Sequence, residues 1–315
     1  MSVDEKTVVI TGANAGIGYQ VALNLSRLGA KIVMACRSME KAGEARTDLL
    51  GEVPGASIDI IPLDVSEPTS INEFVRRFGE QHSTLDILVN NAGIVTPNLY
   101  RNSLGYEIHL ATNYLGAFAL SGLLLPFFSK SGETRIVNVG SLAHRFGKFD
   151  FEDPNWSQRK FNHWKAYAQS KIATAGFTQE LNRRLQMIGS ETIALGAHPG
   201  FAATDMGKKS GAITPKTKFG QWYQDKMEAW VVGPPDQAAQ PIIYAASKEG
   251  VEGGDYYGPD GLFEIKGKPA KARLNPLANN VDFGKRLWAA SEALTGVCFL
   301  PEMDSESLGL ESTIR

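Results

Sequence analysis

The sequence of 315 residues predicts a doubly wound α/β fold, in which one parallel sheet is covered by helices on both faces. Two observations carry this prediction. Short runs of apolar, β-branched residues alternate along the chain with longer segments of helical periodicity. Each helical segment is long enough to return the chain to the start of the next strand, as parallel pairing requires. The composition shows no linker before about residue 200, so we expect one domain over residues 1–315.

The alternation begins near the N-terminus. Strands are predicted at residues 6–10, 31–36, 57–63, 85–90, 135–139 and 192–197. Helices are predicted at residues 17–28, 38–50, 68–79 and 110–128, and around residues 167–171. Ser38 is expected to cap its helix, and Pro68 to lie in the first turn of the next one.

Beyond residue 200 the pattern is less regular. Residues 201–235 are rich in Gly, Lys and Trp and are expected to form a substrate-binding lid after the sixth strand. Residues 237–246 and 283–294 have helical periodicity, whereas residues 253–261 look turn-rich. The polar residues 301–315 are expected to form a mobile tail.

Composition excludes several classes of partner. The chain has 32 basic and 34 acidic residues, a net charge of -2, and no basic run, so we expect neither a nucleic acid nor an anionic membrane surface as partner. The cysteines, Cys36 and Cys298, and the five histidines have no metal-ligand spacing, so no metal is expected. A small molecule is the expected partner.

The same sequence indicates a cytoplasmic protein. Two cysteines far apart suit a reducing compartment, and the first residues lack the zones of a signal peptide. The apolar stretch 110–128 contains Asn113 and Pro126, so we expect a buried helix there and no membrane segment.

Tyr167 and Lys171 lie four residues apart in a predicted helix. Positions four apart share one helix face, so the Lys171 ammonium is expected beside the Tyr167 phenol. A nearby cation lowers the pKa of a phenol from about 10 toward the range in which it exchanges protons at neutral pH. The pair therefore indicates an acid/base that acts on a carbonyl oxygen, and the alternative is an ordinary tyrosine at a helix surface.

A glycine-rich turn follows the first predicted strand. Gly12, Gly16 and Gly18 lie between that strand and the following helix, where glycines let the backbone approach a pyrophosphate at a helix N-terminus. The alternative is a glycine-rich connector without a ligand. The flanking strand and helix favour nucleotide binding.

With these motifs the chain resembles the short-chain dehydrogenase/reductase family, whose fold is of the Rossmann type. The resemblance rests on Thr11-Gly12-x-x-x-Gly16-x-Gly18, Asn90-Asn91-Ala92-Gly93, Asn113, Ser141, the Tyr167/Lys171 pair, and Pro199-Gly200 with Thr204. These motifs occur in the family's order over the first two-thirds of the chain. Taken singly, Asn91 would be a strand cap, Asn113 a helix kink and Ser141 an N-cap.

The resemblance implies a role for each site residue. The Ser141 hydroxyl would bond the substrate oxygen, Tyr167 would exchange the proton, Lys171 would lower the pKa of Tyr167 and hold the ribose, and Asn113 would anchor a water for proton relay. The implied cofactor-binding residues are Gly12, Asn14, Gly16, Ile17, Gly18, Arg37, Ser38, Asp64, Val65, Asn91, Ala92, Gly93, Tyr167, Lys171, Pro199, Gly200 and Thr204. Asp64 and the Val65 backbone are assigned to the adenine.

One position departs from the family pattern. The family often has two consecutive serines where this chain has Gly140-Ser141, and the second serine is the catalytic one, so Ser141 is the catalytic candidate. Either Gly140 widens the pocket or the local backbone requires glycine there.

The end of the second strand indicates which cofactor binds. An acidic residue there would accept hydrogen bonds from the ribose hydroxyls and favour NAD. This chain has Cys36-Arg37-Ser38 instead, and an arginine beside a helix N-terminus suits the 2′-phosphate of NADP. We therefore expect NADP as the cofactor, and NAD is the alternative. The alternative interpretation of Arg37 is a surface arginine at the end of a strand.

Aromatic residues between Ser141 and Tyr167 and in the expected lid favour a bulky hydrophobic alcohol or its ketone or aldehyde. The segments 137–148 and 256–259 look most like the retinol dehydrogenase-like branch of the family. The alternatives are a catalytically silent nucleotide-sensing protein and an enzyme that acts on a carbon–carbon double bond. The apolar helices 110–128 and 166–185 are expected to pair across a two-fold axis, which gives a homodimer or homotetramer.

Overall fold

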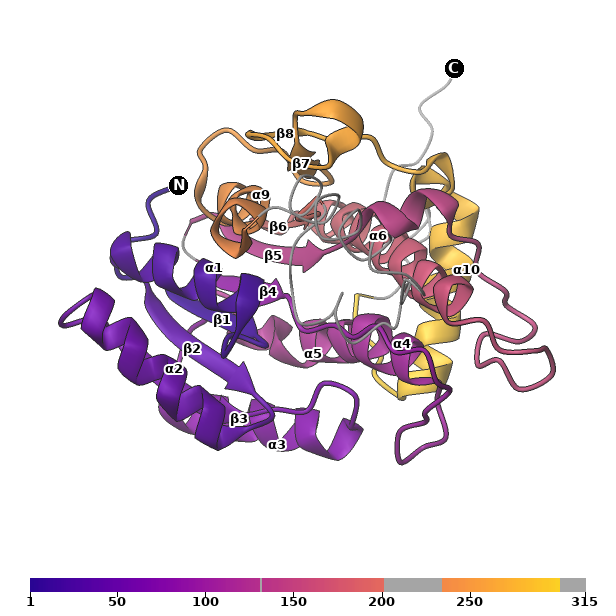
Figure 1. Cartoon of the computed structure of the whole chain (residues 1–315), viewed down its shortest axis with the longest axis horizontal. Helices are drawn as coiled ribbons and strands as arrows, with labels where there is room; N and C mark the ends of the chain where they lie inside the picture. The colour runs from indigo at the N-terminus through magenta and orange to yellow at the C-terminus, as the bar shows by residue number, and fades with distance from the viewer. Residues whose placement is uncertain (131, 201–233, 301–315) are drawn as a thin grey trace, which may run out of the picture.

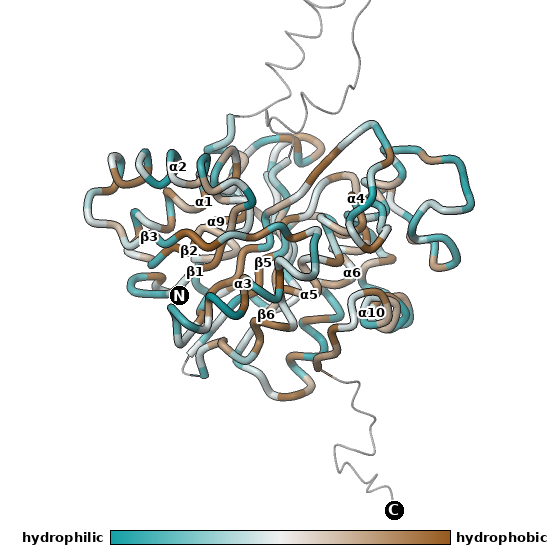
Figure 2. Tube along the Cα trace, turned by 90° about the horizontal axis from the view of Figure 1, so that it is seen from below, coloured by the Kyte–Doolittle hydropathy of each residue, from teal (hydrophilic) through white to brown (hydrophobic). Residues whose placement is uncertain are grey.

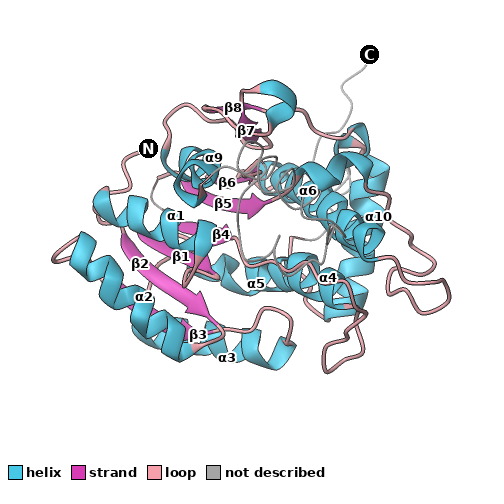
Figure 3. Cartoon of the chain, viewed as in Figure 1, coloured by secondary structure: helices cyan, strands magenta, loops and turns pink. Residues whose placement is uncertain are grey.

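The computed structural model describes residues 1–130, 132–200 and 234–300. Within these residues, eight strands form one sheet in the order β3-β2-β1-β4-β5-β6-β7-β8 (Figures 1 and 3). Strands β1 to β7 pair in parallel, and β8 is antiparallel to β7. The predicted doubly wound α/β fold is therefore confirmed.

The strands are β1 (Thr7–Thr11), β2 (Lys31–Cys36), β3 (Ile58–Pro62), β4 (Ile87–Asn90), β5 (Thr134–Val139), β6 (Thr192–Ala197), β7 (Tyr256–Pro259) and β8 (Pro269–Lys271). The helices are α1 (Gly16–Arg27), α2 (Met39–Glu52), α3 (Pro68–Gln81), α4 (Ile108–Leu110), α5 (Gly116–Leu124), α6 (His163–Met187), α9 (Pro235–Ser247) and α10 (Val281–Thr295). Short helical turns are η1 (Ala111–Leu115), η2 (Leu125–Phe127), η3 (Leu142–Phe146), η4 (Leu262–Glu264) and η5 (Pro276–Asn279).

Two layers of helices cover the sheet, and each buries its own apolar cluster. Helices α1, α2 and α9 pack on one face, with Leu25, Leu49 and Ile242 in their cluster. Helices α3, α5 and α6 pack on the other face. Figure 2 shows that the most hydrophobic stretches run along the central strands, while hydrophilic residues lie mainly on outer helices and loops. Strands buried on both faces explain the nearly continuous apolar runs in the sequence.

The predicted helix 110–128 is present, but it is not uniform. It consists of α4, a π-helical turn η1, α5 and the 3₁₀ turn η2. The stretch Ile108–Phe127 is long and apolar enough to cross a membrane, yet 78% of its most apolar window is buried inside the fold. Such burial is typical of a core helix.

The sequence analysis missed two strands. Residues 253–261 were expected to be turn-rich, but they contain β7, which extends the sheet beside β6. Gly258 misled the prediction, because it is in a strand: a Cβ at this position would lie 2.1 Å from Nε2 of His198. Glycine is needed there for close packing rather than for a turn.

The C-terminal helix α10 adds a further layer outside α6 (Figure 1). Trp288 of α10 is buried, and its ring centroid lies 5.1 Å from that of Phe118 in α5 and 6.0 Å from that of Phe177 in α6. Phe299, just beyond α10, fits against Gly122 of α5, where a Cβ would lie 2.4 Å from its ring. This part of the α5 and α6 surface is therefore covered by the chain's own C-terminal region.

Two regions expected from the sequence fall outside the description. The expected lid is described only at Pro234 and Pro235, and Pro235 opens α9. The expected tail, residues 301–315, lies wholly outside the described residues.

Candidate active site

The glycine-rich turn after β1 has the geometry of a phosphate cradle. Gly12 has φ +66°, and a Cβ on Gly18 would lie 2.3 Å from the Gly12 carbonyl oxygen and 2.5 Å from the Asn91 amide nitrogen. Only glycine fits at such a distance from backbone. Helix α1 begins at Gly16, and Ala15 at its N-cap makes no side-chain cap hydrogen bond. The backbone N–H groups at the start of α1, among them that of Ile17, suit a pyrophosphate. The Asn14 N–H is directed to the Cys36 thiol instead.

The segment after β4 is attached to this turn by hydrogen bonds. The backbone N–H groups of Asn91 and Ala92 donate to Oγ1 of Thr11 over 2.9 and 2.8 Å. The Asn91 side-chain amide donates to the Thr11 carbonyl over 2.8 Å. Asn91 thus does cap a strand end, as the structural alternative held, and it does so at the edge of the cradle.

Arg37 and Asp64 lie at the carboxyl ends of β2 and β3, and they form an ion pair of 3.4 Å. The Arg37 side chain is 78% exposed. Asp64 also accepts hydrogen bonds from the backbone N–H and the hydroxyl of Ser66. The Ser38 hydroxyl accepts from the Lys41 N–H and so caps α2 as predicted. Val65 follows Asp64, and its carbonyl lies so close to α5 that a Cβ on Gly116 would be 2.0 Å from the carbonyl oxygen.

Cys36, where an acid would favour NAD, is buried against the glycine-rich turn. Burial raises the pKa of its thiol to about 11, although the backbone N–H groups of Ala13 and Asn14 lower it. A neutral sulfur therefore lies under the turn, which leaves Arg37 as the charged group at this end of the site.

Tyr167 and Lys171 both lie on the buried side of α6, next to the end of β5 that carries Ser141. The Lys171 ammonium lies 5.9 Å from the Tyr167 ring centroid and donates to the Val139 carbonyl over 2.8 Å. Ser141 caps η3, with its hydroxyl accepting from the Ala143 N–H. The helix spacing thus brings Tyr167 and Lys171 together, and the end of β5 places Ser141, another of the four predicted catalytic residues, beside them.

The electrostatics differ from the expectation in one respect. Burial raises the pKa of Tyr167, and a hydrogen bond with the Ser141 side chain lowers it. Burial lowers the pKa of Lys171 to about 8. In the protein alone, Ser141 rather than Lys171 is therefore the group that favours the Tyr167 phenolate.

Asn113 lies in the π-helical turn η1, where the α-helical hydrogen-bond pattern is interrupted. Its amide nitrogen donates to the Ile94 carbonyl over 3.0 Å and to the Ser170 hydroxyl over 2.9 Å. A Cβ on Gly93 would lie 3.2 Å from Oδ1 of Asn113 and 3.8 Å from Nζ of Lys171. The π turn thus joins the segment after β4 to the Tyr167 helix, as π turns often do at functional sites.

The sequence analysis missed two hydroxyls of α6. The Ser170 hydroxyl donates to the Tyr167 carbonyl over 2.7 Å, and the Thr174 hydroxyl bonds the Asn113 carbonyl over 3.1 Å. Both residues share a face with Tyr167 at helical spacing, which is a signal that the sequence contains. They connect Asn113 to the catalytic helix.

Of the expected nicotinamide loop, Pro199 and Gly200 are described and Thr204 lies outside the described residues. Gly200 has φ +69°, and its N–H donates to Nδ1 of His198 over 3.1 Å. A Cβ here would lie 2.1 Å from the Ile265 carbonyl. Gly200 thus lies against the segment that follows β7.

Among the aromatic residues between Ser141 and Tyr167, Phe146 and Trp164 are exposed, and four others form two groups. Phe149 and Phe151 contact Phe283 of α10 and belong to the core. Phe161 lies 6.3 Å from His109, whose ring lies 6.3 Å from that of Tyr167. Part of the aromatic signal was therefore core packing, and part lies beside Tyr167.

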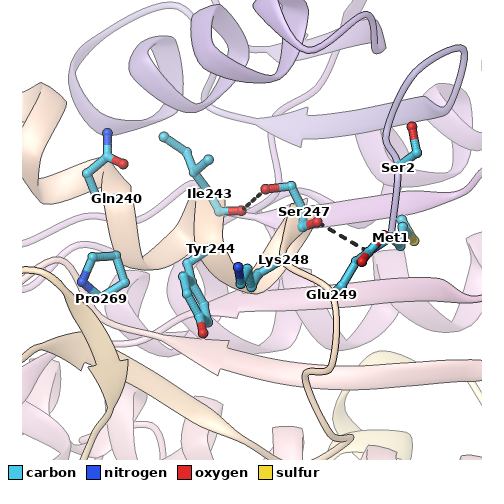
Figure 4. Close-up of a pocket in the computed structure, with 9 residues that line it drawn as sticks. All are labelled: Met1, Ser2, Gln240, Ile243, Tyr244, Ser247, Lys248, Glu249 and Pro269. Carbon is cyan, nitrogen blue, oxygen red and sulfur yellow. Dashed lines mark hydrogen bonds and ion pairs between the residues drawn. The ribbon is translucent and has the colours of Figure 1, made fainter.

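One pocket among the described residues lies away from this site. It has a volume of about 420 Å³ and is lined by Met1 and Ser2, by α9 and by Pro269 of β8 (Figure 4). It contains none of the predicted catalytic or cofactor-binding residues. Within the described residues, no group of three or more His, Cys, Asp or Glu side chains could hold a metal ion.

Comparison with known proteins agrees with this geometry. The profile of the short chain dehydrogenase family matches residues 6–213. The chain belongs to this family. Human retinol dehydrogenase 13 is 40% identical over 298 residues, which cover 93% of this chain and 85% of that protein. Human retinol dehydrogenase 12 is 33% identical over 295 residues, with 93% and 87% covered.

Two solved structures have the same fold. An uncharacterized protein from Mycobacterium paratuberculosis superposes with a TM-score of 0.76 at 35% identity, covering 94% of this chain and 95% of that one. The Pseudomonas aeruginosa RhlG/NADP active-site complex has a TM-score of 0.65 at 23% identity, covering 84% and 98%. As a member of the family, the chain is an NAD(P)-dependent short-chain dehydrogenase/reductase related to retinol dehydrogenases.

Proposed function

We propose that this dehydrogenase interconverts a long, apolar alcohol of the retinoid type and its aldehyde or ketone, with NADP(H) as cofactor and Tyr167 as acid/base. The observation that carries the proposal is the convergence of Ser141, Tyr167 and Lys171 at the end of β5. The relationship to retinol dehydrogenases supports the substrate class. The exposed Arg37 at the end of β2, with no acid at Cys36, supports NADP.

A bound nicotinamide cofactor, held by the glycine-rich turn after β1 and by Arg37, would supply the hydride chemistry at the carbinol or carbonyl carbon. The protein's part is to manage charge and protons at the oxygen. In oxidation, the Tyr167 phenolate takes the hydroxyl proton of the alcohol, and in reduction the phenol gives it to the developing alkoxide. The Ser141 hydroxyl donates a hydrogen bond to the same oxygen.

Burial shifts the pKa values of the two members of the catalytic pair in opposite directions, because it disfavours the charged form of each. It makes the Tyr167 phenolate costly, and it also makes the Lys171 ammonium costly. An ammonium and a phenolate that form together in a dry site compensate each other's charge. We therefore assign Lys171 the role of stabilising the phenolate at the moment of proton transfer.

The test measures oxidation of all-trans-retinol and reduction of all-trans-retinal and decanal, with each of the two cofactors. We expect aldehyde reduction to be faster with NADPH than with NADH. Tyr167→Phe should lower kcat by at least about a thousandfold, the range for loss of an acid/base group, and leave the NADPH Kd within about twofold. Tyr257→Phe is the matched control. The hydroxyl of this β7 tyrosine donates to Asp255, so its loss should leave the activity intact.

Each alternative has its own outcome. Tight NADPH binding without turnover of any carbonyl compound would favour a nucleotide-sensing protein. A product that keeps its carbonyl and loses a carbon–carbon double bond would favour the other reaction class. Near-normal turnover in Tyr167→Phe would refute the role of Tyr167.

A further inference from the structure

A buried tyrosine of the missed strand β7 lies directly behind the catalytic serine. Tyr256 is 5% exposed and is the first residue of β7, where it pairs in register with Gly196 of β6. Its ring lies in a slot formed by two glycines on neighbouring strands. A Cβ on Gly196 would lie 2.3 Å from Cδ2 of the ring, and a Cβ on Gly140 would lie 2.1 Å from the hydroxyl oxygen.

The glycine at position 140 thus has a specific explanation. Gly140 immediately precedes Ser141, and its N–H donates to the Ala197 carbonyl over 2.7 Å. No side chain fits at position 140 while the Tyr256 hydroxyl is present. Neither explanation of Gly140 given above holds: the space beside it is filled by a phenol, so the glycine does not widen the pocket, and its φ is not one that requires glycine.

The Tyr256 hydroxyl belongs to the site electrostatically as well. Burial raises the pKa of Tyr256 far above its usual value, the nearby Tyr167 phenol raises it further, and the Ser141 backbone lowers it. The hydroxyl makes no well-formed hydrogen bond within the described residues. A neutral hydroxyl therefore lies close to both catalytic residues.

Two histidines hold the ring from either side. His144 of η3 lies 5.0 Å from the Tyr256 ring centroid, and its Nδ1 bonds the Ser141 carbonyl. His198 stacks on the same ring at 5.7 Å, and Glu264 fixes its Nε2 at 2.9 Å. A ring held in this way can transmit its position to the turn that carries Ser141.

We propose that Tyr256 is a positioning residue for Ser141 and Tyr167, and that its hydroxyl takes the place of the first serine of the family's serine pair. The hydroxyl is supplied by β7 instead of by position 140, and Gly140 is the space that admits it. The catalytic consequence rests on the proposed function. The steric pairing of Gly140 with Tyr256 does not.

The experiment is a double-mutant cycle in which only one glycine can be rescued. Gly140→Ala places its Cβ against the Tyr256 hydroxyl oxygen, and Tyr256→Phe removes that atom, after which the nearest ring carbon is 3.0 Å away. Gly196→Ala places its Cβ against ring carbons at 2.3 and 2.7 Å, which phenylalanine retains. Tyr256→Phe should therefore rescue the Tm of Gly140→Ala and fail to rescue that of Gly196→Ala.

The positioning role is read from kinetics on any carbonyl compound that the wild type reduces. Tyr256→Phe should lower kcat by about 10- to 100-fold, the cost of a slight misplacement of catalytic groups, with the NADPH Kd within about twofold. Gly140→Ser with Tyr256→Phe returns a hydroxyl from the other side and should regain most of kcat. Gly140→Ala with Tyr256→Phe should not, although its Tm is restored.

A pH titration supplies a readout that needs no substrate. Because the Ser141 hydrogen bond lowers the pKa of Tyr167, displacement of Ser141 in Tyr256→Phe should raise that pKa. The phenolate absorbance of Tyr167 is obtained by subtracting the titration of Tyr167→Phe, in both backgrounds. An unmoved pKa together with wild-type kcat in Tyr256→Phe would overturn the positioning role. Equal rescue of both glycine variants would overturn the steric pairing.

Discussion

Arg37 offers the sharpest test of cofactor preference. In the protein alone its guanidinium is mostly exposed and pairs with Asp64 over 3.4 Å. A hydrogen bond from arginine to a phosphate is worth about 1.5–3 kcal/mol, and an exposed ion pair about 0.2–1 kcal/mol. If binding the 2′-phosphate exchanges the second for the first, Arg37→Ala should weaken NADPH binding by about 0.5–2.8 kcal/mol, or roughly 2- to 110-fold.

The assay compares the Kd values of NADPH and NADH by fluorescence titration, and the kcat/KM ratio for the two cofactors, at one salt concentration. NADH binding should change by less than about twofold, because NADH has no 2′-phosphate. Arg27→Ala is the control: this exposed arginine at the far end of α1 pairs with Glu52 over 2.8 Å. The screened interaction should also weaken as salt is raised.

An NADPH/NADH ratio that stays constant in Arg37→Ala would refute this reasoning. In that case the ion pair with Asp64 would be the whole role of Arg37. An equal loss with both cofactors would instead point to a structural effect at the end of β2.

Three further predictions concern the cradle and the buried lysine. Gly18→Ala should weaken NADPH binding by at least about tenfold, because the new Cβ would lie 2.3 Å from a backbone atom. Gly43→Ala in α2 is the control and should leave binding unchanged, because its Cβ would meet nothing within 4 Å. Equal NADPH Kd values for the two variants would contradict the role of the glycine-rich turn. Burial lowers the pKa of Lys171 to about 8, so NADPH affinity should fall as pH rises through about 8 in the wild type and stay flat in Lys171→Met; parallel titration curves would count against an ammonium contact with the cofactor. Lys171→Met should also raise Tm at pH 7 by a few degrees, because below pH 8 the folded protein bears the cost of a buried ammonium. That cost is relieved between pH 8 and the ordinary lysine pKa of 10.5, so the difference in Tm should shrink over this range. Lys165→Met, at an exposed position of α6, is the control and should show neither effect.

Much of the fold could be predicted because its strands are buried on both faces and its helices repeat at 3.6 residues. The strand 192–197 was predicted with its observed bounds, and the Tyr167/Lys171 pair follows from helical spacing alone. The π turn at Asn113 could not be predicted, since one extra residue in a helix leaves no clear period. Strand β7 was missed because its Gly258 and Pro259 are ordinary turn residues.

The contacts that complete the site join residues far apart in the sequence. Nothing near Gly140 in the chain indicates that a tyrosine of β7 fills the space beside it. Arg37 and Asp64 were predicted as separate ligands, whereas the structure makes them partners of each other. Such pairings depend on strand order, which periodicity does not encode. The predictions for Thr204 and for most of residues 201–235 lie outside the described residues.

The layer formed by α10 has a consequence for self-assembly. The apolar surface of α5 and α6 that was expected to meet a second copy is already packed against Trp288 and Phe299 of the same chain. Two copies can meet through that surface only if α10 is displaced or becomes part of the contact. Helix α10 thus covers the apolar part of α5 and α6 around Phe118 and Phe177. A protein ending before residue 281 would leave Phe118 and Phe177 without this cover and should precipitate more readily than the full chain.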